Sequence, residues 1–140
     1  MPVQVVTPRI RGFVALNAHP EGCAREVERQ IARVRRDPSE WPGGNLLVIG
    51  SSTGYGLASR ITGAFGYGMD SVGIFYERPA TDTRTASAGW YNTVAFTEDA
   101  RAAGLQAINI NGDAFSAEVL EQGLEAVRRI GPLHLFVSSL

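Results

Sequence analysis

The stretch NLLVIGSSTGYGLASR, residues 45–60, decides the fold class of this chain. Its first six residues form an apolar run of strand length, and apolar residues at helical spacing follow from Tyr55. Between them, Gly50, Gly54 and Gly56 stand where the strand would turn into the helix. We interpret this stretch as the first strand, loop and helix of a nucleotide-binding α/β fold.

The same alternation of strands and helices continues along the sequence. The expected strands are 45–50, 71–76, 105–110 and 133–140, and the expected helices are 55–65, 88–103 and 116–130. This order predicts parallel pairing with right-handed crossovers. We therefore predict a Rossmann-like parallel sheet of about four core strands in the order 3-2-1-4, with helices on both faces. The first helix should face the sheet with Leu57, Ala58, Ile61, Ala64 and Phe65.

The first 44 residues precede this fold as an extension. PRIRGFVAL (8–16) has strand propensity, and Pro20 opens a predicted helix. The apolar face of that helix would carry Cys23, Val27, Ile31 and Val34. We divide the chain into an extension, 1–44, and the N-terminal part of a dinucleotide-binding domain, 45–140.

Composition restricts the class of protein. The 140 residues include 13 basic and 14 acidic side chains, so no overall field favours nucleic acid or a membrane surface. No apolar run is long enough for a membrane span, and Cys23, as the single cysteine, cannot form an internal disulfide. We expect a cytoplasmic protein. All 13 basic residues are arginine, which excludes lysine chemistry from these residues.

Each glycine of the loop has a predicted role in holding a pyrophosphate. Gly50 permits a tight exit from the strand, Gly54 lets the backbone approach a phosphate, and Gly56 lets the helix pack on the sheet. The N–H groups at the helix start would bind the phosphates. A purely structural turn is the alternative interpretation. The hydroxyl donors expected beside the glycines are those of Ser51, Ser52 and Thr53.

Two acidic residues follow the next two strands. Glu77 stands where a carboxylate accepts hydrogen bonds from the adenosine ribose and repels a 2′-phosphate, which favours NADH over NADPH. Arg78 would have the opposite effect on that phosphate. Asp113 is placed to accept from the adenine amino group, and Leu140 to lie beside the cofactor. The alternatives are a solvated charge for Glu77 and a capping or turn residue for Asp113.

Six motifs carry a resemblance to a known family. They are PRIRGF (8–13), AHPEGC (18–23), GSSTGYGLASRI (50–61), FYERP (75–79), AGWYN (88–92) and NGDAF (111–115). Together they resemble the N-terminal part of the trans-2-enoyl-CoA reductase family, which includes the FabV-type enoyl-(acyl-carrier-protein) reductases. The resemblance implies NADH as the cofactor and reduction of the 2,3 double bond of an acyl thioester, carried by coenzyme A or acyl-carrier protein, in fatty acid synthesis. The cofactor contacts that it implies are Gly50, Ser51, Ser52, Thr53, Gly54, Tyr55, Gly56, Tyr76, Glu77, Asp113, Ala114 and Leu140.

The resemblance places the catalytic tyrosine and lysine of the family beyond Leu140. We therefore expect no catalytic residue and no enzyme activity in these 140 residues alone. We also expect no metal site, and interpret His19 and Cys23 as a loop histidine and a helix-face cysteine. The last strand would leave an exposed sheet edge through which the chain associates with itself. A stand-alone nucleotide-binding module and a part of another short-chain dehydrogenase stay open as alternatives.

Overall fold

A parallel sheet of four strands forms the centre of the molecule. The computed structural model describes residue 5 and residues 7–140. The sheet has the order β5-β4-β3-β6, which is the predicted order 3-2-1-4 when the core strands are numbered along the chain. Its strands are β3 (Gly44–Ile49), β4 (Met69–Phe75), β5 (Ala107–Asn111) and β6 (Leu135–Ser138).

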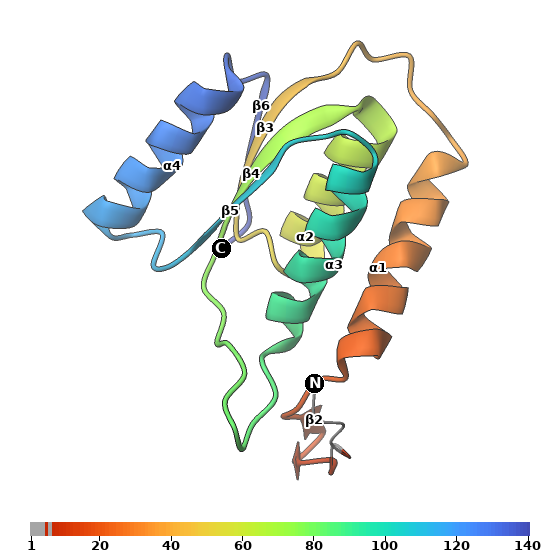
Figure 1. Ribbon diagram of the computed structural model, residues 1–140, viewed down its shortest axis with the longest axis vertical. Helices are drawn as coiled ribbons and strands as arrows, with labels where there is room; N and C mark the ends of the chain where they lie inside the picture. The colour runs from red at the N-terminus through yellow and green to blue at the C-terminus, as the bar shows by residue number, and fades with distance from the viewer. Residues whose placement is uncertain (1–4, 6) are drawn as a thin grey trace.

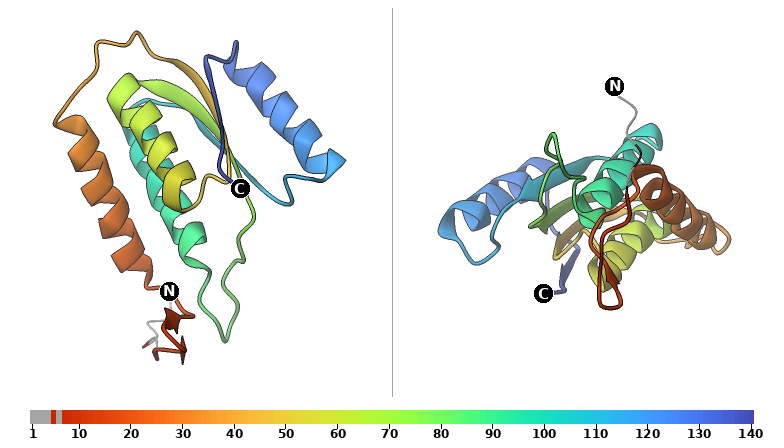
Figure 2. Two further views of the ribbon diagram at one scale, coloured as in Figure 1. Left: turned by 180° about the vertical axis from the view of Figure 1, so that it is seen from behind. Right: turned by 90° about the horizontal axis from the view of Figure 1, so that it is seen from below.

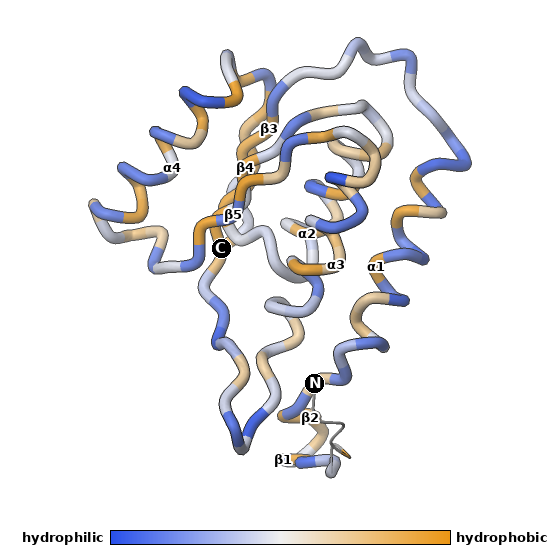
Figure 3. The backbone as a smooth tube through the Cα atoms, in the orientation of Figure 1, coloured by the Kyte–Doolittle hydropathy of each residue, from blue (hydrophilic) through white to orange (hydrophobic). Residues whose placement is uncertain are grey.

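Helices cover both faces of this sheet, as Figures 1 and 2 show. The helices α1 (Pro20–Arg35), α2 (Gly54–Ile61) and α3 (Ala88–Ala102) lie on one side. The helix α4 (Ala117–Ile130) lies alone on the other side. In Figure 3 the hydrophobic colour is concentrated on the central strands and on one side of α4. The predicted fold class is confirmed.

The extension packs into the same body as the sheet. Val27 and Ile31 of α1 share one buried cluster with Ile61 of α2 and Phe96 of α3. The predicted apolar face of α1 is therefore confirmed. No helix within residues 7–140 is long and apolar enough to span a membrane. The domain boundary at residue 45 stays a prediction.

The segment before α1 forms a short antiparallel hairpin instead of one continuous strand. Its strands are β1 (Ile10–Arg11) and β2 (Val14–Ala15). Gly12 turns between them with φ +63°, a left-handed conformation that glycine adopts without strain. The hairpin lies beyond the carboxyl ends of the parallel strands, near the tip of the loop that joins β4 to α3 (Figure 1).

The first core helix differs from its prediction at one position. It continues beyond α2 as a π-helical turn, η1 (Thr62–Gly66). Ala58, which we expected to face the sheet, is exposed, whereas Arg60 is buried. The buried face is formed by Leu57, Arg60 and Ile61, at helical spacing, and Ala58 lies off this face.

Arg60 ties α2 to the two strands beneath it. Its Nε donates to Ser71 Oγ (3.0 Å), Nη1 to Asn109 Oδ1 (2.7 Å) and Nη2 to the Ile108 carbonyl (3.0 Å). The guanidinium carbon lies 4.5 Å from the centre of the Phe96 ring. Burial lowers the pKa of Arg60 to about 9, so the side chain is charged at neutral pH. A polar cluster around Arg60 therefore lies between α2 and the sheet, beside the apolar core.

Candidate cofactor-binding cleft

A cleft of about 470 Å³ opens at the carboxyl ends of the parallel strands. Open α/β sheets bind ligands at this edge, where the strand order reverses. The order reverses here between β3 and β6, because the chain returns to the other side of β3 after β5. The predicted contacts that line the cleft are Gly50, Ser52, Thr53, Gly54, Tyr55, Tyr76, Glu77, Asp113, Ala114 and Leu140. The other two, Ser51 and Gly56, are buried beneath the loop.

The three glycines of the loop have different surroundings. A Cβ on Gly56 would overlap the Gly50 carbonyl oxygen, so only glycine lets α2 start this close to the end of β3. Gly50 has φ +81°, and a Cβ there would overlap the Ser139 carbonyl oxygen. Gly54 has φ +55° with no atom within 4 Å of an added Cβ. The loop is thus closely packed at Gly50 and Gly56 and open at Gly54.

Two of the three expected hydroxyl donors already have acceptors inside the protein. Ser51 Oγ donates to the Ile74 carbonyl (3.3 Å), and Ser52 Oγ donates to Glu77 Oε1 (2.6 Å). Both serines are buried, whereas Thr53 is exposed. We expected all three hydroxyls to face a pyrophosphate, and the structure differs for the two serines because their hydrogens hold the loop to β4 and to Glu77.

The start of α2 supplies the remaining donors. Thr53, the N-cap residue, makes no capping hydrogen bond with its side chain in the part of the chain that the structure describes. Within the described residues, the N–H groups of Gly54, Tyr55 and Gly56 have no acceptor, as the first N–H groups of a helix require an external one. No arginine of the described residues lines the cleft. An anion bound here would therefore meet main-chain N–H groups and the positive end of the helix dipole.

Glu77 is held between the glycine loop and the first turn of α3. Its Oε1 accepts from Ser52, and its main-chain N–H and carbonyl pair with Asn111 Oδ1 (2.8 Å) and Nδ2 (2.9 Å). A Cβ on Gly89 would overlap Oε1, so glycine at the start of α3 makes room for the carboxylate. Oε2 accepts no hydrogen bond from the described part of the chain. This oxygen remains as an acceptor for a ligand.

Asp113 stabilises a turn, which was one of the two interpretations that the sequence allowed. Its Oδ1 accepts from the Phe115 N–H (2.9 Å), and its carbonyl accepts from the N–H (3.0 Å) and the hydroxyl (2.8 Å) of Ser116. Ser116 in turn caps α4 by accepting from the Val119 N–H. The second carboxylate oxygen, Oδ2, has no partner among residues 7–140. A turn role and a ligand role are therefore compatible at Asp113.

Exposed aromatic side chains stand around the cleft. Tyr55, Tyr76 and Phe115 are 87%, 79% and 82% exposed, although each lines the concave surface. Large apolar side chains in a concave site are typical of pockets that bind flat ring systems. The sequence analysis did not assign Phe115, which follows the predicted contacts Asp113 and Ala114.

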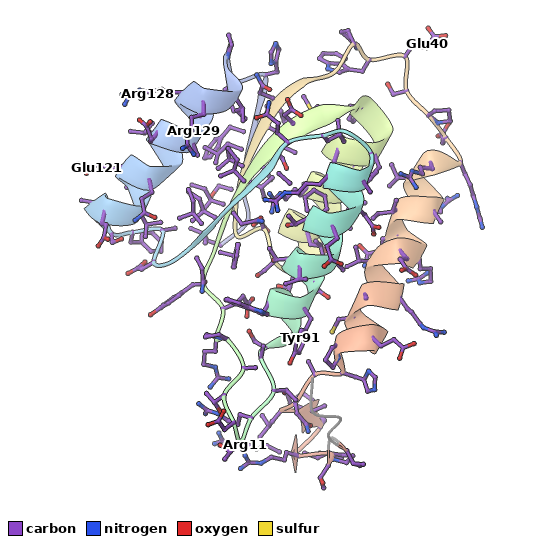
Figure 4. All side chains as sticks on the ribbon, viewed as in Figure 1. Arg11, Glu40, Tyr91, Glu121, Arg128 and Arg129 are labelled. Atoms are coloured by element: carbon purple, nitrogen blue, oxygen red, sulfur yellow. The ribbon has the colours of Figure 1, made fainter. Side chains whose placement is uncertain are left out.

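Two asparagines that the sequence analysis did not assign fix the geometry of the site. Asn92 Nδ2 donates to the Ser52 carbonyl (3.1 Å), which joins α3 to the glycine loop. Asn111 holds the main chain of Glu77. Tyr91, labelled in Figure 4, accepts from the Ala86 N–H (2.9 Å) and anchors the loop before α3. Tyr91 and Asn92 lie in the motif AGWYN, and Asn111 lies in NGDAF. Their positions beside a helix start and a strand end could have indicated these roles in the sequence.

His19 caps a helix and Cys23 is a partly buried residue on a helix face. His19 caps α1, because its Nδ1 accepts from the Gly22 N–H (3.2 Å). Burial raises the pKa of the Cys23 thiol, which disfavours the reactive thiolate. Among the residues with described positions, no group of three or more histidine, cysteine, aspartate or glutamate side chains could hold a metal ion.

Two family profiles match the chain. The NAD(P)H binding domain of trans-2-enoyl-CoA reductase matches residues 5–82, more than half of the chain. The trans-2-enoyl-CoA reductase catalytic region matches residues 84–140. Strands β3 and β4 belong to the first match and β5 and β6 to the second, so both matched regions contribute to one sheet.

Individual relatives give the same result. The enoyl-(acyl-carrier-protein) reductase (NADH) of Colwellia psychrerythraea is 53% identical over 138 residues, or 97% of this chain and 35% of the relative. The protein of the same name from Pseudoalteromonas atlantica is 51% identical with the same coverage. The chain thus spans about a third of the length of these curated relatives.

A solved structure has the same fold. The crystal structure of Treponema denticola trans-2-enoyl-CoA reductase in complex with NAD superposes with a TM-score of 0.91 at 42% identity. The match covers 98% of this chain and 36% of that one. Sequence, fold and the composition of the cleft agree, and the chain belongs to the trans-2-enoyl-CoA reductase family.

Proposed function

We propose that this chain is the N-terminal, NADH-binding part of a cytoplasmic enoyl thioester reductase. The whole protein would reduce the 2,3 double bond of an acyl chain carried by coenzyme A or acyl-carrier protein, in fatty acid synthesis. The family membership and the names of the relatives support this proposal. The observation that carries it is the cleft in which the open start of α2 faces Glu77 and Asp113.

The residues of the cleft fit an NADH molecule. The pyrophosphate would accept from the N–H groups at Gly54, Tyr55 and Gly56, and the open space at Gly54 lets it come close. The free oxygen of Glu77 would accept from the adenosine ribose, and that of Asp113 from the adenine amino group. When bound, NADH supplies the hydride for the reduction. The remaining proposed contacts, through main-chain or apolar atoms, are Gly50, Ser51, Ser52, Thr53, Tyr76, Ala114 and Leu140.

Cofactor preference tests this assignment. We expect the chain to bind NADH more tightly than NADPH, because the Glu77 carboxylate accepts from the ribose and repels a 2′-phosphate. A Glu77→Ala variant should reduce this ratio roughly tenfold to a hundredfold, the usual effect of one hydrogen bond to a charged group. Isothermal titration calorimetry with both cofactors measures the ratio.

Glu125→Ala provides the matched control for this titration. Glu125 is exposed on α4 and does not line the cleft, so its loss should leave both affinities unchanged. Absence of NADH binding by the wild-type chain, or the same ratio in the Glu77 variant, would contradict the assignment.

We further propose that the chain associates with itself through the edge strand β6. This strand pairs only with β3 within the described residues, so its other edge has free main-chain groups. Leu135 and Phe136 of β6 are 42% and 54% exposed. We expect sedimentation velocity to find a dimer whose fraction rises with concentration and falls in Phe136→Lys. Phe13→Lys, at a fully exposed position of the hairpin, is the control; a monomer at every concentration would refute the association.

A further inference from the structure

A second cleft, of about 730 Å³, lies between the β1–β2 hairpin and the loop 78–87. We call it the arginine cleft, because its charged lining residues are all arginines. Figure 4 labels one of them, Arg11, close to the tip of the loop. The four arginines are Arg9, Arg11, Arg78 and Arg84, and no acidic residue of the described part of the chain lines the cleft.

The hairpin wall of the arginine cleft is held by hydrogen bonds. The Leu16 N–H donates to the Arg9 carbonyl (2.7 Å), and the Arg9 N–H donates to Asn17 Oδ1 (2.9 Å). The Ala18 N–H donates to Thr85 Oγ1 (3.4 Å), which joins the hairpin side to the loop side. The main chain that carries Arg9 and Arg11 is therefore fixed relative to the opposite wall.

The loop wall is also ordered by local contacts. Thr81 and Arg84 form an antiparallel bridge in which the Thr81 N–H donates to the Arg84 carbonyl (2.9 Å). The Arg78 N–H donates to Ser87 Oγ (3.1 Å), and the Ser87 N–H donates to the Arg78 carbonyl (3.1 Å). These contacts place Arg78 and Arg84 on one side of a closed loop, so two arginines face the cleft from each wall.

These arginines form no ion pair among the described residues. All four side chains are exposed, and the ion pairs of the described residues are Arg25–Glu21 and Arg29–Glu26, both on α1. The residues outside the description, 1–4 and 6, read MPVQ and V and include no acid. Four exposed guanidinium groups around one concavity, without an ion-pair partner among the described residues, favour a ligand with several negative charges.

We propose that the arginine cleft binds the phosphate groups of a nucleotide-sized polyanion. Guanidinium groups bind phosphate oxygens in a bidentate manner, and the volume is within the range of small-molecule sites. If the proposed reductase function holds, the ligand is the phosphorylated adenosine end of a coenzyme A thioester. The concave shape favours this small molecule over the surface of an acidic carrier protein.

The position of the arginine cleft agrees with a substrate role. Glu77 lines the cofactor cleft and the next residue, Arg78, lines the arginine cleft, so the two sites adjoin along one segment. Among the described residues, the cofactor cleft is lined by carboxylates and no arginine, and the arginine cleft is lined by arginines and no carboxylate. Two anionic ligands would thus be sorted to neighbouring sites by different donors.

Titration of the 140-residue chain with coenzyme A, 3′-dephospho-coenzyme A and pantetheine tests the proposal. We expect coenzyme A to bind most tightly and pantetheine not at all. The double variant Arg9→Gln/Arg11→Gln should weaken coenzyme A binding at least about tenfold, as loss of charge-assisted hydrogen bonds does. Arg128→Gln/Arg129→Gln on α4, visible in Figure 4, removes the same charge away from the cleft and should have no effect.

Several outcomes would overturn the proposal. These are equal affinity in the Arg9/Arg11 variant, pantetheine binding as tight as that of coenzyme A, displacement of coenzyme A by NADH, or binding of an acidic carrier protein but not of coenzyme A. NADH binding is measured on the same samples and should be retained in the Arg9/Arg11 variant. Loss of NADH binding by the wild-type chain would reject the reductase assignment separately. If circular dichroism shows that the double variant is unfolded, Arg84→Gln replaces it.

Discussion

An Arg60→Met substitution is expected to lower the free energy of unfolding by about 2–4 kcal/mol. Methionine matches the arginine side chain only as far as Nε, so it lacks the guanidinium group and donates no hydrogen bond. Asn109 Oδ1 and the Ile108 carbonyl would lose their donors in the interior, and each unsatisfied group costs about 1–3 kcal/mol. Removal of a desolvated charge offsets part of this cost. Gly73, where a Cβ would overlap the guanidinium, would face empty space.

Urea denaturation followed by circular dichroism measures this effect. Arg129→Met is the matched control, because Arg129 is exposed on α4 and its substitution should change stability by less than about 0.5 kcal/mol. If both variants unfolded at the wild-type urea concentration, the Arg60 hydrogen bonds would contribute nothing to stability.

A Gly56→Ala substitution is expected to remove detectable NADH binding and to destabilise the chain by about 1–3 kcal/mol. The added Cβ would overlap the Gly50 carbonyl oxygen, and no side-chain rotation relieves this overlap, because the oxygen is main chain and the Cβ position is set by the main chain of residue 56. Either α2 or the end of β3 must move. The N–H groups that are proposed to bind the pyrophosphate would move with them.

Gly54→Ala separates binding from stability. Nothing lies within 4 Å of its added Cβ, so the cost is that of a left-handed alanine, about 1 kcal/mol. The methyl group would nevertheless occupy the space proposed for the phosphate. Gly104→Ala, with φ +79° and equally open space, carries the same strain far from the loop and should leave NADH affinity unchanged. If the Gly56→Ala variant bound NADH with the same affinity as the wild-type chain, the proposed mode of binding would be contradicted.

The sequence was sufficient for the order of the strands because the signals for it are local. The run 45–50, the glycine loop and the periodic helices each define an element, and chirality rules then restrict the topology. The polar cluster around Arg60 was not predicted from those signals. In β5, Asn109 alternates with Ile108 and Ile110, but its partner Arg60 lies 49 residues away in the sequence.

In the site, too, local signals were predictive and long-range contacts were not. Strand-end positions predicted that Glu77 and Asp113 would lie near the glycine loop, since parallel strands end at one edge. The hydrogen-bond directions were not predictable, because Ser52 finds its acceptor 25 residues away and Asn111 reaches Glu77 across 34. Local patterns locate such residues without indicating which of their polar atoms remain free.

The fit of Glu77 against Gly89 has a consequence for anyone redesigning nucleotide selectivity. Any larger residue at position 89 would displace the Glu77 carboxylate, although residue 89 does not line the cofactor cleft. On the proposed function, discrimination between the two nicotinamide coenzymes is therefore encoded by a pair of positions. A library that varies residue 77 alone would keep the space that Gly89 leaves for a side chain at 77. A library that varies residues 77 and 89 together would also change this space.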